Sequence, residues 1–177
     1  HYLNEAIHLH QQVGNTASEA EALNNLGLVY RAQDQNEIAL NFYERSLPLQ
    51  RAVGNLSGEA STLNNIGVIH RTQKEYDKAL EIYEQVLELR RAVQDKSGEA
   101  ATVNNIGRVY RLKDRIDVAM GYYQQAYGLL EKTGDKINAA TVLSNIAMLH
   151  IETQNWLAAE KTLIAAIELD KEYGLPA

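Results

Sequence analysis

The sequence predicts an all-α protein that folds as a right-handed α-solenoid of helix-turn-helix repeats. One eight-residue pattern recurs every 40 residues, without insertion or deletion, at residues 23–30, 63–70, 103–110 and 143–150. Along two stretches of every period, apolar residues recur at three- and four-residue spacings, as they do in amphipathic helices. A period of this length indicates stacked helical units whose neighbours supply the hydrophobic core.

The array is expected to begin inside a repeat. Residues 1–13 align with residues 41–53, so we expect them to form the second helix of an incomplete repeat. Four full repeats follow at residues 14–53, 54–93, 94–133 and 134–173, which makes residues 1–177 a single array. Because arrays usually end in polar capping elements and none is evident, we expect a fragment of a longer protein.

Each full repeat is expected to hold two helices separated by a short turn. In the second repeat, Ala60, Leu63 and Ile66 mark the first apolar stripe, and Ala79 and Tyr83 mark the second. The turns between the helices are expected at residues 33–35, 73–75, 113–115 and 153–155. Before each first helix stands a short polar residue that can cap its backbone N–H groups. These residues are Asn15, Asn55, Asp95 and Asp135.

Small and large residues occupy fixed positions, which favours close helix packing. The middle of each first helix carries Gly27, Gly67, Gly107 or Ala147, although glycine there costs roughly 1 kcal/mol relative to alanine. Tyrosines at other fixed positions are expected mostly in the core: Tyr30, Tyr110, Tyr43, Tyr83 and Tyr123. Gly54 suits a left-handed helix stop, and Pro48 is expected to kink or locally open its helix.

At these positions the chain resembles the tetratricopeptide repeat family. Leu26-Gly27-x-x-Tyr30 followed by Ala39-x-x-x-Tyr43 matches the family's spacing, and the next two repeats match as well. The 40-residue period is similar to that of the long-helix subclass found in kinesin light chain and in Leu-Gly-Asn-repeat adaptors. The resemblance implies a solenoid that binds a peptide or protein segment in its concave groove.

The chain departs from the family pattern at several positions. Leu23 replaces the family's tryptophan. Three residues with side chains replace the usual turn glycine, and two further departures fall in the last repeat. These residues are Asp34, Lys74 and Asp114 in the turns, and Ala147 and Glu160 in the last repeat.

Asparagine recurs at two adjacent positions of the first helices. The set comprises Asn24, Asn25, Asn64, Asn65, Asn104, Asn105 and Asn145. Asparagine is a mediocre helix former, so repeated copies inside helices need a reason. In similar repeats the asparagine at the second position lies on the concave wall and hydrogen-bonds the backbone of an extended ligand, which suits an amide with both donors and an acceptor. Here this position holds Asn25, Asn65, Asn105 and Asn145. The alternative is that each amide bonds a neighbouring helix and holds adjacent repeats in register.

Arginine forms a second ladder on the same stripe of the first helices. Arg31, Arg71 and Arg111 follow the asparagines by nearly two turns, and Arg108 adds charge in the third repeat. If this stripe faces the groove, the ligand should carry acidic side chains or a free C-terminus, because guanidinium groups suit carboxylates. The alternative is that each arginine complements the helix dipole and is solvated.

Composition and spacing argue against several other functions. The net charge of −6 disfavours nucleic-acid binding, no apolar run is long enough to span a membrane, and the absence of cysteine excludes thiolate sites. His8 and His10 lie on different helix faces, and His70 and His150 replace core tyrosines. We therefore expect a cytoplasmic protein with no catalytic residues, metal or cofactor.

The last repeat is apolar where earlier repeats are polar. Leu157 and Ile164 replace acidic or amide residues, and Trp156 and Ala165 extend the apolar area. Either the final helix rotates slightly, or this area docks a following element or a second copy of the chain.

We expect a protein–protein interaction scaffold that binds a peptide or protein segment in the concave groove. If the arginine ladder faces this groove, the bound segment is acidic. One alternative is a structural module that forms a homodimer through its terminal repeat. The other is a regulatory arm of a larger multidomain protein.

Overall fold

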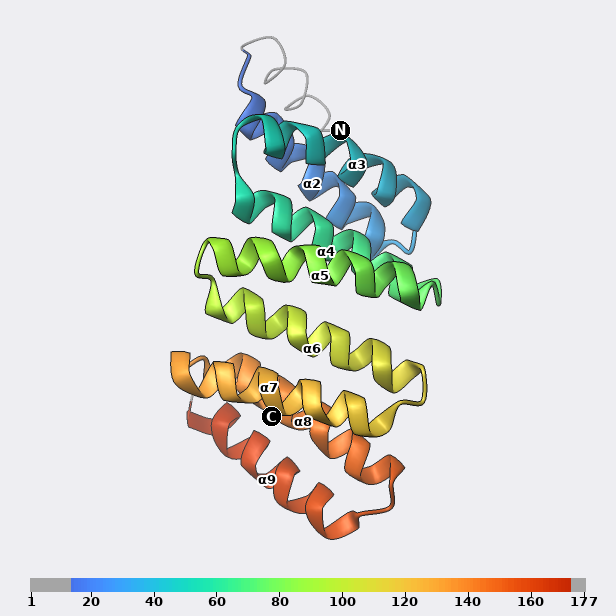
Figure 1. Cartoon of the computed structure of the whole chain (residues 1–177), viewed down its shortest axis with the longest axis vertical. Helices are drawn as coiled ribbons and strands as arrows, with labels where there is room; N and C mark the ends of the chain where they lie inside the picture. Colours follow the sequence, from blue (N-terminus) through green and yellow to red (C-terminus); the bar gives the residue numbers. More distant parts are fainter. Residues whose placement is uncertain (1–13, 173–177) are drawn as a thin grey trace. The chain divides into compact units, whose positions relative to one another are not determined.

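The computed structural model describes residues 14–172, and the regular structure in this range is entirely α-helical. The helices follow one another as shown in Figure 1: α2 (Thr16–Ala32), α3 (Asn36–Ala52), α4 (Leu56–Thr72), α5 (Tyr76–Ala92), α6 (Lys96–Leu112), α7 (Ile116–Thr133), α8 (Lys136–Glu152) and α9 (Trp156–Glu172). The predicted all-α class and the predicted order of helix, turn and helix are confirmed. Residues 1–13, expected as a leading helix, lie outside the described residues, as does residue 173.

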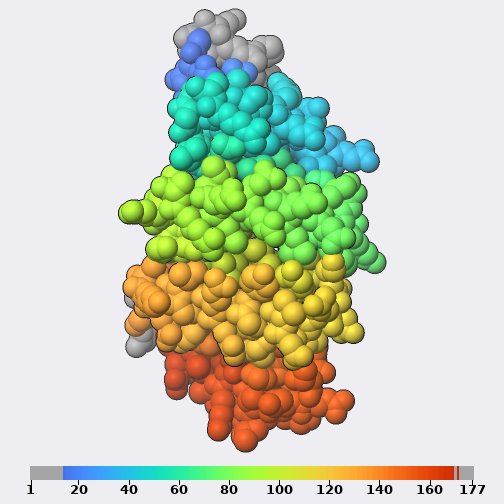
Figure 2. Space-filling model, in the orientation of Figure 1, coloured from blue at the N-terminus to red at the C-terminus, as the bar shows by residue number. Residues whose placement is uncertain are grey.

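The chain divides into two compact units, His1–Val93 and Gln94–Ala177. The described part of the first unit holds α2 to α5, and that of the second holds α6 to α9. Within each unit the helices pack as consecutive pairs, α2 with α3 and α4 with α5, then α6 with α7 and α8 with α9. The pairs join because α3 packs on α4 and α7 packs on α8. On the face shown in Figure 2, side chains fill the space between the helices of each unit.

The first helices begin at the predicted caps. The side-chain oxygens of the four cap residues accept hydrogen bonds from the backbone N–H groups three positions later, at 2.8–3.2 Å. The bonds run from Ser18 to Asn15, from Gly58 to Asn55, from Gly98 to Asp95 and from Asn138 to Asp135. Each bond satisfies one of the N–H groups that the first turn leaves without a helical partner.

The turns inside the repeats contain left-handed residues that carry side chains. Asp34, Lys74, Asp114 and Gln154 have φ angles of 57–63°, where L-residues other than glycine are uncommon. The predicted helix stop at Gly54 is also left-handed, with φ of 66°. The second helices tolerate an irregular residue too: Pro48 lies inside α3, and the helix nevertheless continues to Ala52.

The core of each of the first three repeats is built around one fully buried tyrosine. Tyr43, Tyr83 and Tyr123 are 0% exposed, and each ring packs against the glycine of the preceding first helix. Tyr30 is half-buried and stacks on Phe42 with ring centroids 5.3 Å apart. The tyrosines are therefore packing residues, and the glycines allow the two helices of a repeat to approach.

No helix in the described part of the chain is long and apolar enough to cross a membrane.

Candidate functional site

Asparagine side chains link the first helices of neighbouring repeats. In the first unit, Nδ2 of Asn65 on α4 donates to Oδ1 of Asn24 on α2 at 3.4 Å. The hydroxyl of Thr62 donates to the same oxygen at 3.1 Å. In the second unit, Nδ2 of Asn145 on α8 donates to Oδ1 of Asn104 on α6 at 2.8 Å. We call Asn24–Asn65 and Asn104–Asn145 the amide pairs; they have the geometry expected of a register device.

The first amide pair leaves part of its hydrogen-bonding capacity unused. An asparagine side chain offers two N–H donors and an acceptor oxygen. Among the described residues, the hydrogen bonds of the first pair occupy Oδ1 of Asn24 and Nδ2 of Asn65. The NH₂ group of Asn24 and the oxygen of Asn65 therefore remain as a donor and an acceptor. This combination is the complement of a peptide group.

The predicted asparagines differ in the exposure of their side chains. Asn25 is exposed, whereas Asn64, Asn65, Asn105 and Asn145 are half-buried and Asn104 is 9% exposed. Asn64 and Asn105 make further interactions of their own. Asn25 is thus the ladder residue most open to a ligand.

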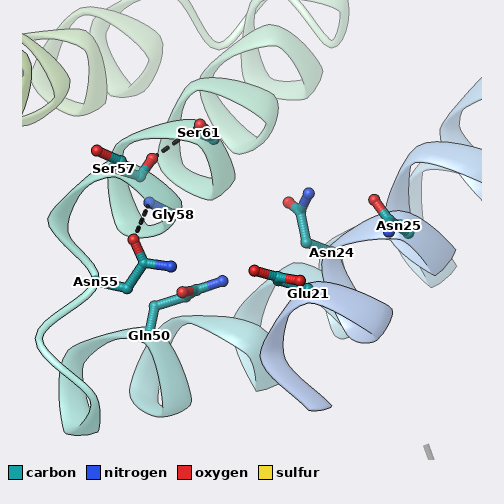
Figure 3. A pocket seen from close by; sticks show the side chains of 8 residues that line it. All are labelled: Glu21, Asn24, Asn25, Gln50, Asn55, Ser57, Gly58 and Ser61. Atoms are coloured by element: carbon teal, nitrogen blue, oxygen red, sulfur yellow. Dashed lines mark hydrogen bonds between the residues drawn. The ribbon is translucent and has the colours of Figure 1, made fainter. Parts of the chain in front are cut away.

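A polar hollow of about 410 Å³ lies in the first unit. Figure 3 shows its lining: residues from α2, the end of α3 and the start of α4. The lining residues are Glu21, Asn24, Asn25, Gln50, Asn55, Ser57, Gly58 and Ser61. The hollow therefore joins two predicted ladder residues to the capped N-terminus of α4.

Two lining residues of this polar hollow could not be chosen from the sequence alone. Gln50 is 2% exposed, and its Oε1 is buried without a hydrogen-bond partner within residues 14–172. Glu21 is exposed and supplies the negative charge of the lining. The available signals were that Glu21 lies one turn before Asn25 and that Gln50 stands where the third repeat has Leu130. Neither signal indicates which helices meet at the hollow.

The arginine ladder is only partly exposed. Arg108 is exposed, Arg31 and Arg111 are half-buried, and Arg71 is 8% exposed. Arg71 makes interactions of its own. Burial raises the pKa of the Tyr43 hydroxyl, and the nearby charge of Arg31 partly opposes this rise. The ladder arginines therefore pack near the core tyrosines rather than extending fully into solvent.

Arg111 already has a carboxylate partner. Its Nε and Nη2 lie 2.8 and 2.7 Å from Oε1 of Glu152, the last residue of α8. This hydrogen bond raises the pKa of Arg111 further above its ordinary value, while burial acts in the opposite direction. By contrast, Nε of Arg31 is buried and has no hydrogen-bond partner in the described part of the chain.

The four apolar residues singled out in the last repeat are exposed, with one exception. Trp156 and Leu157 are each 63% exposed, and Ile164 is 49% exposed. Ala165 is half-buried and lines a small hollow with Tyr127 and Leu143 instead. Leu163 and Ile167 add to the exposed apolar area at 38% and 49%. We call Trp156, Leu157, Leu163, Ile164 and Ile167 the α9 patch.

His70, the histidine described in the first unit, bonds to neighbouring side chains. Nδ1 of His70 lies 2.5 Å from Oε2 of Glu75, and Nζ of Lys78 lies 2.9 Å from Oε1 of the same carboxylate. The hydrogen bond from Lys78, followed by that from His70, lowers the pKa of Glu75. The group joins the end of α4 to the start of α5. His8 and His10 lie outside the described residues, within which no cluster of three metal-ligating side chains occurs.

Comparisons with known proteins agree with this architecture. The family model of the tetratricopeptide repeat matches residues 1–52 and 58–132. Among solved structures, BtubC (BKLC) from P. vanneervenii aligns with a TM-score of 0.76 at 18% identity, over 92% of this chain and 67% of BtubC. A Rap protein complexed with Competence and Sporulation Factor aligns with a TM-score of 0.80 at 18% identity, over 88% of this chain and 43% of Rap.

The comparison with curated proteins found no match. The structural likeness shows the fold, an all-α solenoid of helix pairs. The chain spans less than half the length of the Rap protein. On the matched repeats, the chain belongs to the tetratricopeptide repeat family, whose members generally act as protein-interaction scaffolds.

Proposed function

We propose that the chain binds an extended segment of a partner protein along its first helices, with asparagine amides contacting the backbone of that segment. The observation that carries the proposal is the first amide pair. Its internal hydrogen bonds leave the NH₂ group of Asn24 as a donor and the oxygen of Asn65 as an acceptor, the two kinds of group needed to bind one peptide unit. The Rap relative, solved as a complex with a factor, supports binding as a use of this fold.

The first amide pair is also held in place before any ligand arrives. Oδ1 of Asn24 accepts from both Thr62 and Asn65, and Thr62 is fully buried. These two bonds fix the orientation of the Asn24 amide. A preformed site loses less conformational entropy on binding, so the register bonds support ligand binding rather than compete with it.

The test of this proposal uses Asn25, which lines the polar hollow and is exposed. Peptides selected from a random displayed library on the intact chain would be titrated into the wild type and Asn25→Ala. We expect Asn25→Ala to weaken binding roughly tenfold, because a lost hydrogen bond costs about 1 kcal/mol or more, and to leave the melting temperature unchanged.

Asn41→Ala is the matched control, since Asn41 is an exposed helical asparagine on α3 that does not line the hollow. Equal affinities of the wild type and both variants would contradict the groove proposal. Loss of affinity in both variants would place the peptide elsewhere.

A second candidate is self-association, for which the α9 patch is the specific observation. Contiguous exposed apolar area is unusual on soluble monomers. Two copies of the chain joined through this patch would form a homodimer of the isologous type.

A further inference from the structure

The two units repeat one geometry between their first helices. In each amide pair the bonded asparagines are 41 positions apart in the chain. A residue of α2 or α6 therefore meets the residue 41 positions later on α4 or α8. The residue pairs between α2 and α4 can therefore be compared with those between α6 and α8.

Arg111 and Glu152 obey the same relation. They are 41 positions apart, and one carboxylate oxygen accepts from both Nε and Nη2 of the arginine. The charge and the fork of donors make such a pair stronger than a neutral hydrogen bond. In the second unit the guanidinium is thus satisfied by the chain itself.

The first unit lacks this carboxylate. The residue 41 positions after Arg31 is Thr72, at the last position of α4, as Glu152 is the last residue of α8. The hydroxyl of Thr72 donates to the carbonyl of Ile69 at 2.8 Å. Nε of Arg31 stays buried without a partner in the described residues. Burial raises the pKa of the nearby Tyr43 hydroxyl, whereas the charge of Arg31 and its hydrogen bond with that hydroxyl lower it.

We propose that Arg31 binds a carboxylate group of the ligand in the place that Glu152 occupies at Arg111. The carboxylate comes from an acidic side chain or from the C-terminus of the bound segment. This inference rests on the proposed function and narrows it, because it assigns binding of a ligand carboxylate to Arg31 and not to Arg111. Arg31 lacks an internal carboxylate, whereas Arg111 is bonded to that of Glu152.

Charge along α2 restricts where this carboxylate lies. Glu21 and Arg31 stand ten positions apart in the sequence on the same helix, which corresponds to about 15 Å at 1.5 Å per residue. A ligand carboxylate would be repelled at the Glu21 end and attracted at the Arg31 end. The bound segment is therefore acidic near the C-terminal end of α2 and neutral or basic over the polar hollow.

The site is tested on the intact chain by NMR of the arginine Nε–H groups during titration with sodium acetate. Sodium chloride at the same ionic strength is the control for screening, and Arg31→Lys identifies the Arg31 signal. We expect a saturable shift of the Arg31 signal with acetate, no such shift with chloride, and no response of Arg111.

Two substitutions then exchange the residues at the equivalent positions 72 and 152 of the two units. Thr72→Glu should supply the missing internal carboxylate and abolish the acetate response of Arg31, whereas the isosteric but neutral Thr72→Gln should preserve it. Glu152→Thr should make Arg111 respond to acetate. Backbone amide spectra confirm that each variant is folded. An Arg31 signal that ignores acetate, or that responds equally in Thr72→Glu and Thr72→Gln, overturns the proposal.

Probe peptides separate the two sources of the carboxylate. An acetylated, amidated hexapeptide of serine and alanine with one glutamate is compared with its glutamine form and with the glutamine form ending in a free carboxylate. Preference for either acidic form by about tenfold, lost in Thr72→Glu, supports the proposal and names the source. Equal binding of all three leaves groove binding intact and overturns the carboxylate site. An acetate response with no peptide bound supports the site and contradicts groove binding.

Discussion

At the residue scale, the proposed function gives Asn24 two duties that are usually treated as alternatives. Its oxygen accepts from Thr62 and Asn65, and this ties α2 to α4. In the proposed function, its NH₂ group contacts the ligand. A change at Asn24 should therefore alter both stability and binding, whereas a change at Asn25 should alter binding alone. The distinction explains why Asn25 is the better residue for testing function.

Gly67 illustrates a position where packing outweighs helix propensity. A Cβ at Gly67 would lie 2.7 Å from Cε1 of Tyr83, whose side chain is fully buried. Gly67→Ala should destabilise the protein by up to about 2 kcal/mol, because overpacking costs about 1–3 kcal/mol and alanine regains about 1 kcal/mol in helix propensity. Urea denaturation followed by circular dichroism measures the change.

Gly121→Ala is the matched control for Gly67→Ala. Gly121 is also helical, but it is exposed and a Cβ there would meet no atom within 4 Å. This substitution should stabilise the protein by about 0.5–1 kcal/mol. Stabilisation by both substitutions would show that the glycine–tyrosine contact can relax.

At the element scale, the start of α8 should respond to acid. Burial alone would raise the pKa of Asp135, but hydrogen bonds from the side chain and backbone N–H of Asn138, and from Ser97, lower it below its ordinary value. A carboxyl group with a lower pKa in the folded state stabilises that state above its unfolded pKa of about 4. This contribution disappears as pH falls through the folded pKa.

Asp135→Asn tests this acid response, because asparagine caps α2 and α4 in the same way. At pH 7 the variant should be less stable by about 0.5 kcal/mol, since a negative charge favours a helix N-terminus by about 0.3–1 kcal/mol when exposed. Below pH 3 the two proteins should melt at nearly the same temperature. A melting difference that is constant between pH 7 and pH 3 would contradict the assignment.

The helices and their caps could be predicted because they follow from local pattern. Periodic apolar residues marked the helices, and short polar residues preceded each first helix. The left-handed turn residues were harder, because Asp34 and Lys74 occupy positions where glycine is usual and side chains disfavour the conformation. Pro48 was expected to kink or open α3; the helix continues past it to Ala52, and Leu47 beside it packs on the core.

The candidate site was less predictable because it depends on which helices meet. The sequence singled out Asn24 and Asn25, but the contribution of Gln50 requires that the end of α3 lies beside the start of α4. The pairing of Arg111 with Glu152 likewise requires the 41-residue relation between α6 and α8. Repeat alignment compares residues 40 positions apart and does not reveal which side chains touch.

At the scale of the whole molecule, the open face of α9 stands out within the second unit. In the first unit Tyr43 and Leu47 of α3 pack against Ile66 and Ile69 of α4. The residues of α9 at the same positions in the repeat are Leu163 and Ile167, and they are exposed. The α9 patch thus extends a face that inside the first unit is covered by the next helix.

Self-association through the α9 patch predicts a concentration-dependent dimer. Leu157→Glu combined with Ile164→Lys should shift the chain toward monomer, because charged side chains are costly to bury in an apolar interface. Leu112→Glu is the control, since Leu112 is 53% exposed but lies on α6, away from the patch residues of α9. Multi-angle light scattering over a range of concentrations measures the mass. If the wild type stays monomeric at the highest concentration, homodimer formation is excluded, and the peptide-binding proposal stands independently because its residues lie in the first unit.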